Sequence, residues 1–175
     1  VDREFWLKAG EAGIMGGSVA EEFGGSGGDM GFDSVALYEQ ARAGDGSWGY
    51  GIQSIVIHYV SAYGSDEQKT KWLPKLVSGE KIGALAMTEP GAGSDVQSIT
   101  TSAQKDGNQY TINGSKIFIT NGQSADLVIV TSKTDKNEGA KGVSLIMVDT
   151  SKADGFRRGK NLKKLGLKGN DTSEL

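Results

Sequence analysis

The spacing of apolar residues changes near residue 82, and this change limits the chain to a helical part followed by a strand-rich part. Before the change, apolar side chains recur at helical spacing in residues 3–11 and 32–43, and each segment has a glycine just beyond it. Residues 47–63 are rich in Ile, Val and Tyr, are long for a strand and end at Gly64, so they are predicted to form a largely buried helix. Ser65 and Gln68 then form a capping-box pattern. The helix that they open is expected to run to about Trp72 and to bend or end at Pro74. We therefore predict a helical domain over residues 1–82.

The remainder of the chain has the pattern of short β-strands. Turn signals at Lys105-Asp106-Gly107-Asn108 and at Asn113-Gly114 predict hairpins. The expected strands are residues 110–112, 116–119, 127–130 and 143–148. Because no helical segment separates them, these strands favour an antiparallel sheet over a parallel one. The predicted fold class is α+β: a helical N-terminal domain followed by an antiparallel β-sandwich or barrel domain over residues 83–175.

Composition excludes several classes of function. The net charge of −3 provides no basic field for nucleic acid. The absence of cysteine and the single histidine, His58, leave little material for a zinc site or a histidine-dependent hydrolase. His58 lies in an apolar run and is expected in the core or at an interface. No apolar run approaches the ~20 residues of a transmembrane helix, and residues 1–4 lack a signal-peptide layout. The first residue is not Met, and both ends read as cut.

The segment from Met87 to Gln97 is the best candidate for a binding site. It follows an apolar run and turns through Pro90, Gly91 and Gly93, which can expose backbone N–H groups together with hydroxyls. Such donors suit a phosphate-bearing or heteroaromatic ligand. The glycines resemble a dinucleotide fingerprint, but its last glycine is missing and a strand-turn-strand setting is wrong for one. The residues alone indicate a protein that binds a polar ligand between its domains.

Glu89 lies within this turn and is a tempting general base. Pro90 holds it in an extended conformation, and no neighbour in the sequence would raise its pKa. We therefore interpret Glu89 as a structural or solvated carboxylate.

Two segments resemble the acyl-CoA dehydrogenase family. Residues 87–95, Met-Thr-Glu-Pro-Gly-Ala-Gly-Ser-Asp, are similar to the first signature of that family, and residues 113–122 are similar to its flavin-side strand. Shorter matches extend over nearly the whole chain: residues 8–13, 21–25, 63–68, 73–74, 79–80 and 164–167. The sequence around Ser115-Lys116 and over residues 162–175 is most similar to the long-chain branch.

This resemblance implies a fold and a reaction. The family has a helical N-terminal domain, a middle β-domain and a C-terminal four-helix domain. The chain would hold most of the first two, with the first helix missing and the last β-strand truncated after Leu175. The four-helix domain would be absent. The implied reaction is the FAD-dependent oxidation of an acyl-CoA to the 2,3-enoyl-CoA, as in fatty-acid β-oxidation, with electrons passing to an electron-transferring flavoprotein. The full-length protein would be a homo-oligomer, in the bacterial cytoplasm or the mitochondrial matrix and not secreted.

The resemblance also assigns residues. The flavin would be lined by Leu85, Ala86, Met87, Thr88, Gly93, Ser94, Phe118, Ile119 and Thr120. Thr88 would bond the pyrimidine side of the ring, Thr120 would lie near N5, and Ser94 would meet both the cofactor and the substrate. Phe118 stands where the family often has Trp. The base of the family is a glutamate of the missing domain, so no catalytic residue is expected in this chain, and the chain alone should be inactive.

Two other functions remain open from the sequence. An acyl-CoA oxidase or flavin monooxygenase could have the same architecture but react with oxygen. The second possibility is a truncated, catalytically inactive module that packs against partner proteins. Neither the acyl chain length nor the identity of the catalytic glutamate can be derived from these residues.

Overall fold

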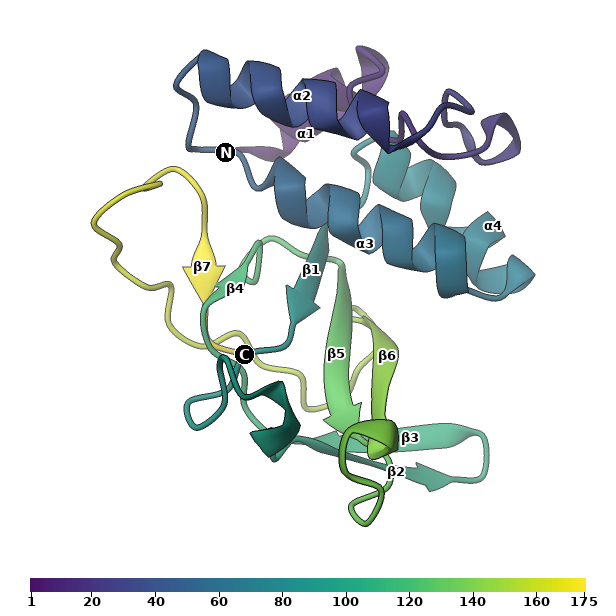
Figure 1. The fold of residues 1–175 in the computed structure, drawn as a ribbon, viewed down its shortest axis with the longest axis vertical. Helices are drawn as coiled ribbons and strands as arrows, with labels where there is room; N and C mark the ends of the chain where they lie inside the picture. The colour runs from purple at the N-terminus through teal and green to yellow at the C-terminus, as the bar shows by residue number, and fades with distance from the viewer.

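The computed structural model describes all of residues 1–175, with the helices gathered at one end and the strands at the other (Figure 1). The four main helices are α1 (Arg3–Glu11), α2 (Met30–Arg42), α3 (Tyr50–Tyr63) and α4 (Asp66–Val77), and a short 3-10 turn spans Glu21–Phe23. The four helical segments expected from the sequence are confirmed. None of the helices combines the length and apolar character that crossing a bilayer requires.

Local hydrogen bonds explain where the helices begin. The carboxylate of Asp2 accepts a bond from the Phe5 N–H and caps α1. Ser65 caps α4, and its hydroxyl and the Gln68 side chain form the predicted capping box. The predicted end of α4 is wrong, because the helix continues through Pro74 to Val77. Buried residues beyond the proline, Leu76 and Val77, belong to the main apolar cluster, and this packing outweighs the backbone hydrogen bond that proline cannot make.

The main core lies where α3 and α4 cover the start of the sheet. The buried members of this cluster are Val19, Val56, Ile57, Val60, Trp72, Leu73, Leu76, Val77, Leu127 and Ile129. Gln53 of α3 is fully buried in this layer. Its amide donates to the carbonyls of Leu76 and Lys81, and its oxygen accepts from the Gly83 N–H at 2.7 Å. One side chain therefore joins two helices to the first strand. His58 is exposed on α3, so its predicted place in the core is wrong, and the alternative of an interface stays a prediction.

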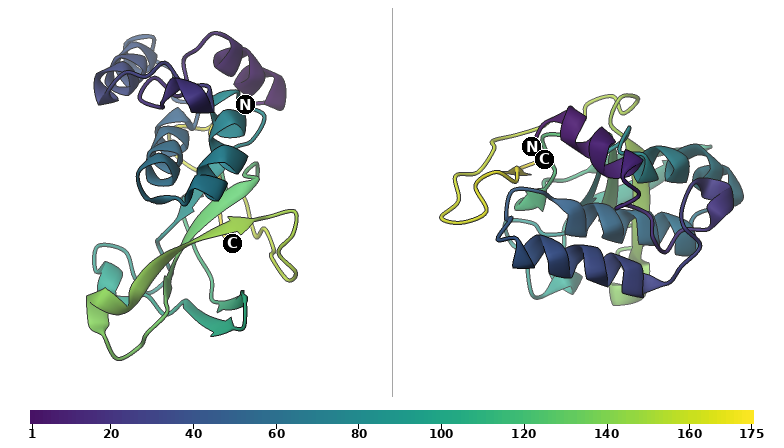
Figure 2. Two further views of the ribbon diagram at one scale, coloured as in Figure 1. Left: turned by 90° about the vertical axis from the view of Figure 1, so that its right-hand side faces the viewer. Right: turned by 90° about the horizontal axis from the view of Figure 1, so that it is seen from above.

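The strands form one mixed sheet and one small pair. They are β1 (Gly83–Ala86), β2 (Ser102–Asp106), β3 (Gln109–Asn113), β4 (Ile119–Thr120), β5 (Leu127–Lys133), β6 (Val143–Asp149) and β7 (Thr172–Ser173). The larger sheet has the order β1-β5-β2-β3, with β6 also paired to β5, and β4 pairs with β7. Figure 2 shows the sheet extending away from the helical layer. The helical part followed by a β part is confirmed, and the division at residue 82 stays a prediction.

Two details of strand pairing bear on the sequence prediction. The sheet is not purely antiparallel, because β1 and β5 run parallel, with Gly83 opposite Leu127. Both strands leave the helical layer at one point, where the N–H groups of Asp126 and Leu127 donate to the Ile82 carbonyl. The hairpin predicted at Asp106-Gly107 is confirmed and joins β2 to antiparallel β3.

The second predicted hairpin, at Asn113-Gly114, is wrong. Neither residue has the positive φ that a type I′ turn requires. Gly114 serves close packing instead, since a Cβ there would lie 2.3 Å from the Thr101 hydroxyl oxygen. The chain then leaves the sheet, and of the expected strand 116–119 only its end becomes strand, in β4.

Candidate functional site

The turn that follows β1 is closed by its own backbone. The Glu89 N–H donates to the Ala92 carbonyl at 2.9 Å, and the Ala92 N–H donates back to Glu89 at 3.1 Å. Pro90 and Gly91 form the bend between them, and Gly93, Ser94 and Asp95 continue it as exposed residues. The turn therefore presents a short, solvent-facing stretch of backbone held at a fixed base.

The second predicted segment lies against this turn. The Ile117 N–H donates to the Thr88 carbonyl at 2.9 Å, and β4 packs beside β1. Phe118 has a φ of +61° and is 63% exposed, in a segment that also holds buried Lys116 and Ile119. Asn121, at a φ of +62°, is buried and donates to the carbonyls of Gly49 and Gly83. These bonds fix where the segment leaves the helical layer.

The residues predicted to line the site fall into three groups. Gly93, Ser94 and Phe118 are exposed, and Leu85, Met87, Thr88 and Thr120 are partly buried. Ala86 and Ile119 are buried in an apolar cluster behind the site. Their side chains are packed in this core, so a ligand in front of the turn would meet only their backbone.

Several hydrogen-bond donors in the two segments have no partner within the chain. The backbone N–H groups of Thr88, Gly93 and Ser94 have no acceptor. The hydroxyls of Thr88, Ser94 and Thr120 make no hydrogen bond. Donors left free on a fixed turn are a means of binding a ligand that carries acceptor atoms.

A buried ion pair lies at the base of the turn. The Lys116 ammonium is 2.9 Å from a carboxylate oxygen of Glu89, and both side chains are almost completely buried. The same oxygen accepts from the Thr101 N–H, and the other accepts from the N–H and hydroxyl of Thr100. Lys116 also donates to the Met87 carbonyl at 2.9 Å. The structural role expected for Glu89 is confirmed.

The hydrogen bonds also set the ionisation of this pair. Burial by itself would raise the pKa of Glu89, but the bonds from Thr101, Thr100 and Lys116 outweigh it and lower that pKa to about 2. Burial lowers the pKa of Lys116, and the nearby Glu89 carboxylate partly offsets this effect. Glu89 is therefore ionised at neutral pH with its oxygens occupied, and it cannot serve as a general base.

Lys116 is not among the residues that the sequence predicts for the site. The residues after it, Ile117, Phe118 and Ile119, are all apolar, so they show no alternation that would assign the lysine to a buried face. Its partner lies 27 residues away in the sequence. Only the folded chain brings the two charges together.

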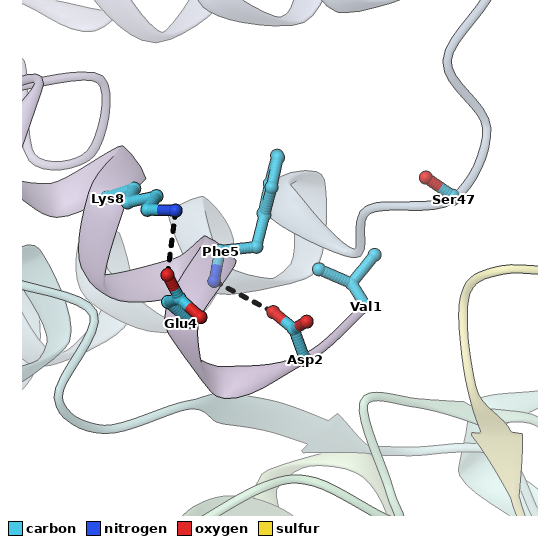
Figure 3. A pocket seen from close by; sticks show the side chains of 6 residues that line it. All are labelled: Val1, Asp2, Glu4, Phe5, Lys8 and Ser47. Carbon is cyan, nitrogen blue, oxygen red and sulfur yellow. Dashed lines mark hydrogen bonds and ion pairs between the residues drawn. The ribbon is translucent and has the colours of Figure 1, made fainter.

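Two hollows of the surface lie away from the candidate site. One of about 330 Å³ is lined by residues around the start of α1: Val1, Asp2, Glu4, Phe5, Lys8 and Ser47 (Figure 3). Its charged side chains are engaged locally, Lys8 with Glu4 at 2.7 Å and Asp2 with the Phe5 N–H. Another, of about 310 Å³, lies between α4 and β5–β6. Neither of these two hollows includes a residue of the turn or of β4. No group of three His, Asp or Glu side chains is placed to hold a metal ion.

Comparison with known proteins assigns both halves of the chain. Residues 1–80 match the family model described as acyl-CoA dehydrogenase, N-terminal domain, and residues 84–175 match that of the acyl-CoA dehydrogenase middle domain. The chain belongs to the acyl-CoA dehydrogenase family. The resemblance noted for residues 87–95 and 113–122 is thereby confirmed.

Individual members of the family cover the whole chain. It is 46% identical to the mitochondrial long-chain specific acyl-CoA dehydrogenase of Sus scrofa, over 100% of this chain and 41% of that protein. The solved acyl-CoA dehydrogenase of Geobacillus kaustophilus has a TM-score of 0.94 and 46% identity, over 99% of this chain and 46% of the other. The chain thus spans less than half the length of these relatives.

Two further solved structures are similar to this chain; one is a complex with FADH2 and the other is an oxidase. A glutaryl-CoA dehydrogenase from Mycobacterium smegmatis in complex with FADH2 has a TM-score of 0.88 and 32% identity, over 99% of this chain and 44% of its own. The prolyl acyl carrier protein oxidase AnaB has a TM-score of 0.83 and 32% identity, over 99% of this chain and 47% of its own.

Proposed function

We propose that residues 1–175 supply the helical and middle β portions of an FAD-dependent acyl-CoA dehydrogenase that oxidises acyl-CoA thioesters to 2,3-enoyl-CoA. The observation that carries the proposal is the face made by residues 87–94 and 117–120. These segments hold free N–H and hydroxyl donors and the exposed Phe118, in a chain whose two halves both match the family. A flavin ring has carbonyl and nitrogen acceptors on its pyrimidine side and a flat apolar side, so these residues fit it.

Each predicted residue has a place in this proposal. The Thr88 N–H and hydroxyl would bond the pyrimidine side of the flavin, Thr120 would lie near N5, and Phe118 would flank the ring. Ser94 would bond both the cofactor and the thioester arm of the substrate. Leu85, Ala86, Met87, Gly93 and Ile119 would contribute backbone and contact surface. When bound, FAD supplies the hydride acceptor, and the chain supplies orientation and polarisation.

The proton-abstracting carboxylate would come from outside residues 1–175. Glu89 has its oxygens occupied, and the Asp95 carboxylate accepts a bond from the Ser98 hydroxyl at the exposed end of the turn. We therefore expect the isolated 175-residue chain to show no octanoyl- or palmitoyl-CoA-dependent dye reduction. Turnover above the buffer rate would contradict this assignment of the base.

Cofactor binding can be tested separately from catalysis. The full-length protein that contains these residues should be purified, freed of ligand and titrated with FAD. Binding should quench flavin fluorescence and give the structured visible spectrum of a protein-bound flavin. A protein that is folded but leaves the fluorescence and spectrum of FAD unchanged would exclude the proposed function.

A flavin-dependent oxidase is the second candidate, since an oxidase shares the fold over the whole chain. Rapid oxidation of the substrate-reduced flavin by oxygen would favour it. Slow reaction with oxygen, together with fast electron transfer to an electron-transferring flavoprotein, would favour the dehydrogenase.

For the dehydrogenase we propose the mitochondrial matrix or the bacterial cytoplasm as its location and a homo-oligomer as its assembly. A module that serves only to pack against partner proteins would bind neither FAD nor acyl-CoA.

A further inference from the structure

Lys116 binds the carbonyl of one peptide group in the proposed flavin site. Its ammonium donates to the Met87 carbonyl at 2.9 Å from a side chain that is only 4% exposed, so this carbonyl is held on the buried side of the turn. The chain has no cis peptide bond. In a trans peptide the carbonyl and the following N–H point in opposite directions. The Thr88 N–H is therefore directed away from Lys116.

The carbonyl of Thr88 itself is also hydrogen-bonded, by the segment that contains Lys116. It accepts from the N–H of Ile117, the residue directly after Lys116 in the sequence, at 2.9 Å. The carbonyls before and after the Thr88 N–H are thus both bound by consecutive residues of one segment. The N–H and hydroxyl of Thr88 are the groups of this residue that remain without a partner.

We propose that Lys116 is a positioning residue, which fixes the peptide between Met87 and Thr88 so that the Thr88 N–H meets an acceptor of the flavin. This inference rests on the proposed function. Lys116 lies behind the turn and acts through the Met87 carbonyl without touching the ligand. Glu89 has a different part: it balances the buried charge of Lys116 and ties the turn to Thr100 and Thr101.

Two variants separate this role from a purely structural one. In Glu89→Gln, Lys116 keeps its hydrogen bond to the Met87 carbonyl but loses its charged partner, so the stability of the protein falls. In the double variant Glu89→Gln/Lys116→Met, no charge is left buried and much of the stability returns. In both variants the single amide oxygen of the glutamine can accept from Thr100 or from Thr101 but not from both, so this loss is shared. Only in the double variant has the Met87 carbonyl also lost its donor. Stability and FAD affinity should therefore move in opposite directions between the two proteins.

The experiment measures the Kd for FAD and the denaturant midpoint in the full-length protein. We expect the Kd of Glu89→Gln to stay within about threefold of wild type, and that of the double variant to rise about tenfold, with a changed visible flavin spectrum. Asp126→Asn is the control. Asp126 binds Arg3 and Lys81 at the junction of the helices with β1, so its loss should lower stability and leave the Kd within about twofold.

Each outcome decides the matter. A double variant that binds FAD with the wild-type Kd and spectrum would overturn the positioning role. So would a Glu89→Gln protein that is folded and as weak in FAD binding as the double variant. If Glu89→Gln fails to fold, the Kd for FAD and the flavin spectrum of the double variant still test the positioning role of Lys116. Failure of the wild-type protein to bind FAD would instead refute the proposed function on which the inference depends.

Discussion

The charge on Glu89 should make a large and pH-dependent contribution to stability. Its pKa falls from an ordinary value of 4.5 to about 2 in the folded chain. At about 1.4 kcal/mol for each pH unit between the two values, ionised Glu89 stabilises the fold by about 3 kcal/mol. Removal of one partner from a buried ion pair typically costs about 3–5 kcal/mol, which agrees with this value. We therefore expect Glu89→Gln to lower the free energy of unfolding by about 3 kcal/mol near neutral pH.

The pH dependence has a definite sign. A carboxyl group whose pKa is depressed on folding stabilises the protein fully above the unfolded value, here 4.5, and loses this contribution as the pH falls towards 2. The difference in the free energy of unfolding between wild type and Glu89→Gln should therefore be largest above about pH 5. It should shrink as the pH falls from 4.5 towards 2. Glutamine cannot titrate, so the variant should lack this part of the acid sensitivity.

Denaturant unfolding followed by far-ultraviolet circular dichroism measures both effects. Glu80→Gln is the matched control, because Glu80 forms an exposed pair with Lys75 at 3.7 Å and should change stability by less than about 0.5 kcal/mol. Wild-type stability in Glu89→Gln near neutral pH would refute the reasoning. A difference from wild type that stays constant as the pH falls would refute the assignment of that stability to the ionised carboxylate.

Two further predictions concern the two segments of the site. Ser94→Ala should leave stability within about 0.5 kcal/mol, because Ser94 is exposed and its hydroxyl has no partner in the chain, while the Kd for FAD should rise measurably in a fluorescence titration. An unchanged Kd would remove Ser94 from the cofactor site. Asn121→Gly should cost about 2 kcal/mol in thermal unfolding, since two buried carbonyls lose their donor. Asn121→Ala should cost about 1 kcal/mol more, because its φ of +62° disfavours alanine; equal midpoints for the two variants would contradict the assigned backbone cost.

The sequence alone determined the features that depend on neighbouring residues. The capping box of Ser65 and Gln68, the turn at Gly107 and the apolar spacing of α1 and α2 are local, because each depends on side chains within a few positions of one another. The two segments of the candidate site are also identified from the sequence, through their resemblance to the acyl-CoA dehydrogenase family. The structure places them in contact, at the bond between Ile117 and Thr88.

The tertiary structure decided what depends on distant residues. The parallel pairing of β1 with β5 is set by the shared exit of both strands at Ile82, and the continuation of α4 through Pro74 is set by packing of its last turn. Likewise, the burial of Lys116 depends on a carboxylate that is remote in the sequence. Long-range contacts of this kind overcome local preferences because burial and charge pairing are worth several kcal/mol, whereas a local propensity is worth about 1 kcal/mol or less for most residues.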